Sequence, residues 1–332
     1  MNITFFHWAQ NSPPSITRSF NPLITELKKN HNVKVFHVPY SGGNPINILR
    51  NILFVYKHRD KTGINHITGD IHYCILGLIG VKSVLTIHDD YAIKKASNLL
   101  NKIYKYIFWI YLPIKLATKT VFISEATQKK INKLIKVPSG VVIANHTVDS
   151  EFQYTPQKFH NENPTILQIG TSEQKNLETT LKVISQLNIP CTLRVIKKMT
   201  PQQHQMAKDL HINYSNAFNL SDSEIIEEYK KADIVAFPSI YEGFGMPIIE
   251  GQATGRVVIT TNASPMKDVA GKNGAILLNN PLDDKEYKNK LKEVISNEEL
   301  RTNLIQNGLI NAAQYTIQKV TSKYINFYKQ IL

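Results

Sequence analysis

Two glutamates that flank a glycine-rich loop are the residues of this chain best placed to do chemistry. Glu242 precedes Gly243 and Gly245, and Glu250 follows with seven residues between the two acids. Glycines allow main-chain N–H groups to approach an anion, whereas carboxylates repel an anion and accept hydrogen bonds from hydroxyl groups. This pattern fits a phosphate with hydroxyl-bearing groups on both sides. A nucleotide sugar has that layout.

A strand and a helix must hold this loop in place. Ile234–Phe237 is a short β-favouring run, and Pro247 stands where the first turn of a helix prefers proline. In an open parallel sheet, such a strand–loop–helix unit places its loop at the carboxyl edge and points helix N–H groups at a ligand. The sequence therefore predicts an anion site at the start of the helix.

The loop and three further segments resemble the retaining family 4 glycosyltransferases. The two glutamates, with Gly-Phe-Gly-Met-Pro inside, match the E-x7-E signature of that family. The other matches are Ile166–Gly170 followed by Lys175–Glu178, Tyr229 with Ala232–Ile234, and Asn262–Met266 followed by Asp268–Gly271. Together the matches cover most of residues 164–313. Four matches in the expected order are much more specific than the signature alone.

The resemblance implies an α/β protein of the GT-B architecture, with two Rossmann-like domains facing across a cleft. It implies an acceptor-side domain over residues 1–150, a nucleotide-sugar-binding domain over residues 151–315, and a last helix over residues 316–332 that crosses back to the first domain. The pattern of the chain agrees, because short apolar runs alternate with helical segments in both halves. The best linker candidate is the polar segment 145–163.

The expected strands of the two halves follow from these apolar runs. In the first half they are Ile3–Phe6, Val33–Val38, Ile64–Thr68, Ser83–Ile87, Thr120–Ile123 and Val141–Ala144. In the second half they are Thr165–Ile169, Thr192–Ile196, Ile234–Phe237, Val257–Thr260 and Gly274–Leu278. A capping box from Ser221 to Glu224 is expected to open a further helix.

The resemblance also assigns roles to residues of the second half. Glu250 would bind the ribose hydroxyls of the donor, Glu242 would act next to the transferred sugar, and Lys175 would offset the charge of the departing diphosphate. The other implied donor contacts are Gly170, Thr171, Gly243, Phe244, Gly245 and Met246. The structural alternatives are an acid favoured by the first turn of a helix for Glu250 and a solvated lysine for Lys175.

Two departures from the family pattern affect the predicted donor contacts. Thr171 stands where the family often has an arginine, so one cation is missing unless Lys197 or Lys198 supplies it. The family's glycine pair after the first strand is replaced by residues 7–14, and Gly42-Gly43 lies late in the sequence for a substitute. The donor contacts of the first domain are therefore open at this stage.

A histidine of the first half is the second catalytic candidate. His88 ends the strand Ser83–Ile87 and resembles the family histidine near the donor sugar, where it would hydrogen-bond a hydroxyl of the sugar or the acceptor. The alternative is a structural histidine that pairs with a nearby carboxylate. His7, His66 and His72 are candidates with less support.

The positive charge of the chain is concentrated in its first half. Residues 1–150 hold 19 lysines and arginines and 7 aspartates and glutamates, whereas residues 151–332 hold 20 and 19. Such a field suits an anionic membrane, a pyrophosphate-linked acceptor or nucleic acid. Residues 91–124 lack acids and mix lysines with aromatic residues, which is typical of a helix at a membrane interface. A helix packed between the domains with its lysines in water is the alternative. No nucleic-acid motif accompanies the charge, and no nucleic-acid partner is expected.

Cysteine usage and the N-terminus bear on the compartment. Cys74 and Cys191 lie in separate apolar runs, so two buried thiols are expected, with no metal site. Residues 1–7 read as a first strand and not as a signal peptide, and no apolar stretch is long enough to span a bilayer. We expect a cytoplasmic protein, with peripheral association at the inner face of the membrane as a further expectation.

The resemblance, together with these observations, implies a retaining, metal-independent glycosyltransferase of surface polysaccharide assembly. Its donor would be a UDP- or GDP-sugar, its acceptor a saccharide or lipid-linked saccharide, and it would need no cofactor. The alternatives are a nucleotide-sugar epimerase or a phosphorylase on the same architecture, and a non-catalytic basic protein that binds membranes or nucleic acid. A glycosidase with a carboxylate pair would leave the glycine loop unexplained.

Overall fold

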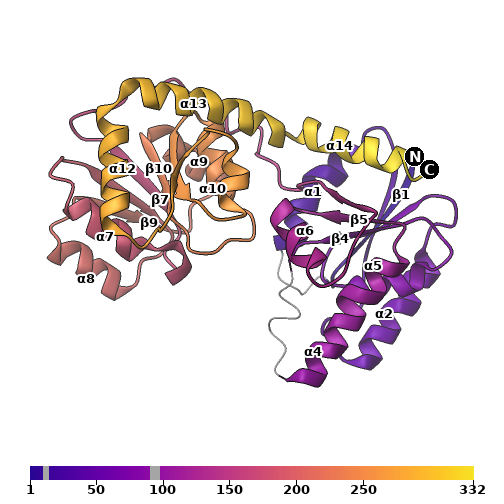
Figure 1. Ribbon diagram of the computed structural model, residues 1–332. Coiled ribbons are helices and arrows are strands. Elements are labelled where there is room, and N and C mark those ends of the chain that lie inside the picture. The colour runs from indigo at the N-terminus through magenta and orange to yellow at the C-terminus, as the bar shows by residue number, and fades with distance from the viewer. Residues whose placement is uncertain (10–14, 90–97) are drawn as a thin grey trace. The chain divides into compact units, whose positions relative to one another are not determined.

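The chain forms two compact units in the computed structural model, which describes residues 1–9, 15–89 and 98–332. Unit 1 comprises Met1–Thr147 together with Ile317–Leu332, and unit 2 comprises Val148–Thr316 (Figure 1). Residues 10–14 of the predicted first-strand loop and residues 91–97 of the predicted membrane-interface segment lie outside the described residues.

Unit 1 is built on a six-stranded parallel sheet in the order β2-β1-β3-β4-β5-β6. The strands are β1 (Asn2–His7), β2 (Asn32–His37), β3 (Ile64–Ile67), β4 (Ser83–Ile87), β5 (Lys119–Phe122) and β6 (Gly140–Val142). The helices are α1 (Ser15–Lys28), α2 (Pro45–His58), the 3-10 helix η1 (His72–Leu78), α4 (Leu99–Lys105), the π-helix η2 (Tyr106–Tyr111), α5 (Leu112–Leu116), α6 (Glu125–Asn132) and α14 (Ile317–Lys329).

Alternate residues of the unit 1 strands point into two separate cores because successive side chains of a strand face opposite sides of the sheet. Phe5 belongs to a core shared with α1 and α14, whereas Phe6 belongs to a core shared with α2, η1 and the π-helix. Figure 1 shows α14, in yellow, running along unit 1 beside α1. The last helix therefore covers one face of the first sheet.

Unit 2 has a six-stranded parallel sheet in the order β12-β11-β10-β7-β8-β9. Its strands are β7 (Thr165–Ile169), β8 (Thr192–Ile196), β9 (Tyr214–Ala217), β10 (Ile234–Phe237), β11 (Val257–Thr261) and β12 (Ile276–Leu278). Its helices are η3 (Glu173–Lys175), α7 (Leu177–Ser185), α8 (Pro201–Asp209), α9 (Asp222–Lys231), α10 (Met246–Ala253), α11 (Met266–Ala270), α12 (Asp284–Ser296), α13 (Glu298–Ala312) and η4 (Ala313–Tyr315).

Both sheets confirm the predicted α/β class with parallel strands. All eleven expected strands are present, four of them with the predicted bounds. The capping box at Ser221 and Glu224 opens α9 as expected. The edge strand β9 was not predicted, because its sequence Tyr-Ser-Asn-Ala lacks the apolar run that marked the other strands. Both cysteines are free and buried, as expected.

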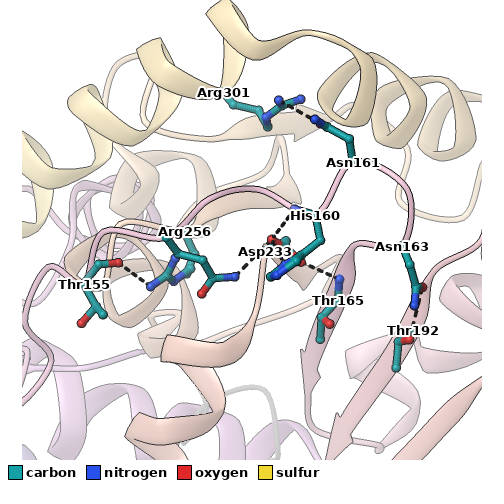
Figure 2. A network of polar contacts seen from close by, with 10 residues as sticks. Thr155, His160, Asn161, Asn163, Thr165, Thr192, Asp233, Arg256 and Arg301 are labelled. Atoms are coloured by element: carbon teal, nitrogen blue, oxygen red, sulfur yellow. Dashed lines mark hydrogen bonds and ion pairs between the residues drawn. The ribbon is translucent and has the colours of Figure 1, made fainter.

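The predicted linker is ordered in the structure by a network of polar contacts (Figure 2). Asp233 is almost fully buried, and its carboxylate accepts hydrogen bonds from the main-chain N–H groups of His160 at 3.1 Å and Thr165 at 2.8 Å. Arg256 donates to the carbonyl oxygen of Thr155 at 2.7 Å. Since Thr165 begins β7 and Asp233 directly precedes β10, the network fixes the N-terminal ends of these two neighbouring strands.

Candidate functional site

The carboxyl ends of β7 and β10 mark the point where the strand order of unit 2 reverses. The chain proceeds from β7 to β8 on one side and from β10 to β11 on the other, and β7 and β10 are hydrogen-bonded neighbours. Ligands of doubly wound sheets bind in the crevice at such a switch point. The loop after β7 and the glycine loop after β10 meet there, since Ile240 N–H donates to the carbonyl oxygen of Gln174 at 2.8 Å.

An ion pair joins the two loops at this edge. The ammonium group of Lys175 pairs with the carboxylate of Glu242, and the two side chains are only 20% and 11% exposed. Lys175 Nζ also lies 4.6 Å from the centre of the Phe237 ring, a favourable cation–π distance. Gly170 has a φ of +99°, and a Cβ there would lie 2.6 Å from Lys175 Cγ. The side chain of Lys175 therefore passes directly over Gly170, where a larger residue would collide with it.

The glycine loop leaves room for a ligand. An added Cβ at Gly243 would meet no heavy atom within 4 Å, so no packing constraint requires glycine at that position. Gly245 has a φ of +110°, which favours glycine, and forms the N-cap of α10. Among the described residues no side chain caps α10, and helix N-termini favour anions. The loop thus offers main-chain groups to a phosphate.

Glu250 is held on α10 by a tyrosine of α9. The fully buried Tyr229 donates its hydroxyl hydrogen to Glu250 Oε2 at 2.5 Å. Burial raises the pKa of Glu250 to about 7, the charge of Asp222 adds to this increase, and the hydrogen bond from Tyr229 opposes it. In the sequence, only the family resemblance pointed to Tyr229. Its role as the partner of Glu250 could not be read from spacing.

The remaining predicted donor contacts take different positions. Thr171 Oγ1 donates to the carbonyl oxygen of Lys198 at 2.7 Å, while the Lys198 ammonium lies 5.9 Å from the centre of the Phe218 ring. Phe244 is buried, with its ring 5.7 Å from that of Tyr315, and Met246 is partly buried at the start of α10. Thr171 thus lies in the loop after β7, and the Phe244 ring is turned into the protein beside Tyr315.

His88 follows β4 at the carboxyl edge of the unit 1 sheet. Its Nε2 donates to the carbonyl oxygen of Thr68 at 2.8 Å. Burial lowers the pKa of His88, so the ring is neutral near pH 7 and its Nδ1 is an acceptor. This side chain is suited to accept a hydrogen bond from a hydroxyl group.

The other candidate histidines of unit 1 are buried. His7 Nδ1 lies 2.7 Å from Thr68 Oγ1, and burial lowers its pKa to about 4, with the charge of His37 adding to the effect. His66 contacts Tyr328 OH at 2.6 Å and Thr86 Oγ1 at 2.7 Å, and His72 contacts the carbonyl oxygen of Trp109 at 2.7 Å. His66 and His72 are therefore structural residues, whereas His7 shares Thr68 with His88.

Asp70 is a titratable residue at this edge that the sequence analysis did not single out. It follows β3, and burial raises its pKa to about 6, with the charge of Asp89 adding to the increase. The only sequence signal for Asp70 was its position among polar residues directly after a buried strand. Its carbonyl oxygen accepts the indole N–H of Trp109 at 3.0 Å.

The described residues of the predicted membrane-interface segment form a part packed against the core and an exposed part. Trp109 is buried, and Tyr104, Tyr106 and Phe108 pack against the core of unit 1. Leu99 and Leu100 of α4 are exposed, at 71% and 79%. The aromatic part therefore packs within unit 1, and α4 keeps apolar side chains at the surface. No helix within the described residues is long and apolar enough to cross a membrane.

Comparisons with known proteins agree with the site in unit 2. Residues 149–309 match the family model described as glycosyl transferases group 1. The O-antigen chain mannosyltransferase RfbU of Salmonella typhimurium is 28% identical over 218 residues, covering 63% of this chain and 60% of that protein. The chain spans between 26% and 60% of the length of the first curated relatives that it matches.

Solved structures share the fold over nearly the whole chain. A glycosyltransferase from Rickettsia africae has a TM-score of 0.79 at 20% identity, covering 99% of this chain and 98% of that one. Anabaena Alr3699/HepE in complex with UDP also has a TM-score of 0.79, at 14% identity, covering 99% of this chain and all of that one. The predicted pair of Rossmann-like domains is therefore confirmed.

Proposed function

We propose that this protein is a retaining glycosyltransferase that moves a sugar from a UDP- or GDP-sugar to a saccharide or lipid-linked saccharide acceptor in surface polysaccharide assembly. The match of residues 149–309 to glycosyl transferases group 1 supports the reaction class. The similarity to an O-antigen mannosyltransferase supports the process, and the UDP complex of a protein with the same fold supports the donor class.

The observation that carries the proposal is the pairing of Lys175 with Glu242 at the switch point of unit 2, beside the glycine loop that begins the helix of Glu250. Lys175 and Glu242 lie on the loops after two adjacent strands, the open glycine loop follows Glu242, and Glu250 lies on the helix that this loop begins. This combination provides positive charge and main-chain groups for a diphosphate and acceptors for the hydroxyls on either side of it.

The ion pair defines what the site must do when a donor binds. The diphosphate would compete with Glu242 for the Lys175 ammonium, which would then stabilise the charge that develops on the leaving nucleotide. Glu242, released from the lysine, would accept hydrogen bonds from hydroxyls of the transferred sugar. In the reaction the acceptor oxygen bonds to the anomeric carbon, the bond from that carbon to the phosphate oxygen breaks, and the proton of the acceptor passes to the departing diphosphate.

Glu250 and His88 complete the proposed set of contacts. The Glu250 carboxylate would accept hydrogen bonds from the two ribose hydroxyls of the nucleotide, with Tyr229 fixing its orientation. The neutral His88 ring would accept a hydrogen bond from a hydroxyl of the sugar or acceptor through Nδ1. Acceptor geometry and the family resemblance support both proposed roles.

We further propose that transfer needs no metal ion, because Lys175 and the loop amides provide the positive potential at the diphosphate. Turnover that persists after treatment with EDTA and is not increased by added Mg²⁺ or Mn²⁺ is the expected result. A lipid-linked acceptor would also bring the protein to a membrane surface, where residues 91–124 are the contact region predicted from sequence.

Calorimetric titration with a panel of UDP- and GDP-sugars tests the proposal. One donor of the panel is expected to bind, and Glu250→Ala is expected to weaken that binding at least ten-fold, since it removes two hydrogen bonds to a charged group. Unchanged binding by the variant would refute the assignment of Glu250. Incubation of the donor without acceptor distinguishes the alternatives, because an epimerase would convert the donor alone and a transferase would not.

A further inference from the structure

Helix α2 of unit 1 carries two apolar stripes, of which only one is used by the core. Ile48 and Val55 are buried on the inner side. On the outer side Ile46, Leu49, Leu53 and Tyr56, at spacings of three and four residues, are 64%, 58%, 49% and 55% exposed. Residues three and four apart lie on one side of a helix. Four large apolar side chains thus form a continuous outer stripe.

A second group of exposed apolar side chains lies on α4, which contacts the turn before α2. Tyr104 OH donates to the carbonyl oxygen of Gly43 at 3.4 Å, which links α4 to the turn before α2. Figure 1 shows α2 and α4 as neighbours in unit 1. The apolar side chains of Leu99, Leu100 and Ile103 on α4 are 71%, 79% and 47% exposed.

Basic residues gather at the other end of the outer stripe. An open hollow of about 410 Å³ at the C-terminal end of α2 is lined by Lys34, Lys57, His58, Arg59 and Lys61, together with Thr4, Phe36 and Asp60. The guanidinium of Arg59 lies 3.5 Å from the centre of the Tyr56 ring, so the hollow adjoins the stripe.

The single carboxylate of the hollow is already engaged. Asp60 Oδ1 accepts hydrogen bonds from the N–H groups of Thr62 at 2.9 Å and Gly63 at 2.7 Å. In the sequence, no acid occurs from Leu27 to Arg59, although six lysines and arginines do. The surface around α2 therefore attracts anions and holds little charge that would repel them.

We propose that α2 lies in the surface of a bilayer containing anionic lipids, with its outer stripe among the acyl chains and the basic hollow on lipid phosphates. Charge complementarity decides this occupant, because a helix with an apolar stripe beside lysine and arginine matches the boundary between headgroups and acyl chains. Arg50 and Lys57, which flank the stripe, can extend their apolar stems along it while their charges reach the phosphates.

This docking face differs from the segment 91–124 that the sequence indicated. Tyr104, Tyr106, Phe108 and Trp109 of that segment pack against the core, so the outer stripe of α2 forms the docking face, and the exposed side chains of α4 add to it. The proposal does not depend on sugar transfer. Donor binding is measured without vesicles, and docking is measured without a donor.

Flotation of the full-length protein with phospholipid vesicles is the test. Vesicles of phosphatidylcholine mixed with phosphatidylglycerol are expected to carry the protein, and vesicles of phosphatidylcholine alone are not. Raising the salt concentration should reduce binding, since screening weakens the attraction of basic residues to the surface. Each lysine or arginine near an anionic surface contributes roughly a five-fold gain in affinity.

Two sets of variants locate the binding surface. Leu49→Gln with Leu53→Gln, and the triple variant Lys34→Gln, Lys57→Gln and Lys61→Gln, are each expected to lower vesicle affinity at least ten-fold. All five positions are exposed, so these changes should leave the thermal midpoint close to that of the unchanged protein. The matched controls in unit 2 are Leu282→Gln with Ile310→Gln, and Lys182→Gln with Lys208→Gln and Lys285→Gln.

The controls change apolar area and net charge by similar amounts at other places, and they are expected to float like the unchanged protein. Equal losses in the control and α2 variants would show a general charge effect and overturn the proposal. Failure of the unchanged protein to float would overturn it as well. If sedimentation velocity shows a dimer that Leu49→Gln with Leu53→Gln dissociates, the stripe is a contact between two copies and the membrane proposal is wrong.

Discussion

The hydroxyl of Tyr229 on α9 donates a hydrogen bond to the carboxylate of Glu250 on α10. Burial raises the pKa of this acid to about 7, although the hydrogen bond from Tyr229 opposes the increase. An acid in such surroundings costs stability when it ionises, and costs of this kind are typical of functional sites. The proposed function is to accept the ribose hydroxyls of the donor.

The first prediction concerns stability and pH at Glu250. Its folded pKa of about 7 exceeds the ordinary value of 4.5, so the folded state binds more protons between these values and stability falls as pH rises through that window. Above pH 7, Glu250→Gln should raise the free energy of unfolding by about 1 to 2 kcal/mol, and below pH 4.5 it should change little. Urea denaturation at several pH values measures this difference.

The same variant should lose donor affinity while it gains stability, because an amide side chain accepts fewer hydrogen bonds and carries no charge. Glu299→Gln on the exposed side of α13 is the control, and its stability should follow the pH curve of the unchanged protein. If Glu250→Gln destabilises the fold at every pH, the carboxylate has a structural role.

The second prediction separates the two members of the ion pair. Glu242→Gln removes a negative charge beside the diphosphate and frees Lys175, so the affinity for UDP or GDP alone should rise by roughly three- to ten-fold. Sugar transfer should nevertheless fall by about 100-fold or more, because the acceptor for the sugar hydroxyls is weakened. Calorimetry gives the affinity, and single-turnover measurements give the transfer rate.

Lys175→Ala should act in the opposite direction on binding and weaken the affinity for the nucleoside diphosphate about ten-fold or more. Lys182→Ala, on the exposed side of α7, is its control and should bind as the unchanged protein does. Weaker binding of the diphosphate by Glu242→Gln would contradict the proposed competition for Lys175.

The third prediction concerns His88. His88→Ala should lower kcat at least ten-fold and leave the affinity for the nucleoside diphosphate within about three-fold, because the ring is assigned to a hydroxyl of the sugar or acceptor. His88→Asn, whose amide oxygen can take the place of Nδ1, should recover part of kcat. Because burial lowers the pKa of His88, protonation of this ring should not reduce kcat as pH falls from 8 to 6.5. Equal kcat values for the two variants would contradict the acceptor role of Nδ1.

Much of the fold could be predicted because the strand signal is local. Ser83–Ile87, Thr165–Ile169, Thr192–Ile196 and Ile234–Phe237 have the predicted bounds, since each is a largely buried run of β-favouring residues. The contact between Lys175 and Glu242 could not be predicted from spacing, as 66 residues separate them and only the order of the strands brings them together. The outer stripe of α2 was also missed. An apolar residue in a helix does not reveal which of two sides meets the core.

The fourth prediction concerns acid stability of unit 1. Burial lowers the pKa of His7 and His72 to about 4 and that of His66 to about 3. Below the ordinary value of 6.5 the unfolded chain binds more protons than the folded one, so stability falls as pH falls, by about 1.4 kcal/mol per pH unit for each histidine.

Tryptophan fluorescence reports this loss selectively, since both tryptophans of the chain, Trp8 and Trp109, belong to unit 1. The urea midpoint of the fluorescence transition should fall steeply between pH 6.5 and pH 4.5. His72→Gln should make that fall shallower by the contribution of one histidine to stability, about 1.4 kcal/mol per pH unit. An unchanged midpoint over this range would contradict the assignment of buried, neutral histidines.

Residues 317–332 also affect the order in which the two units can fold during synthesis. Helix α14 supplies Tyr324 and Tyr328 to the core of unit 1 that contains Phe5 and α1. Tyr328 is also the hydrogen-bond partner of His66. On the ribosome, unit 2 emerges as one continuous stretch and can fold at once. The core of unit 1 stays open until α14 has been synthesised. Nascent chains halted before α14 should therefore recruit chaperones through their first half, although that half is translated first.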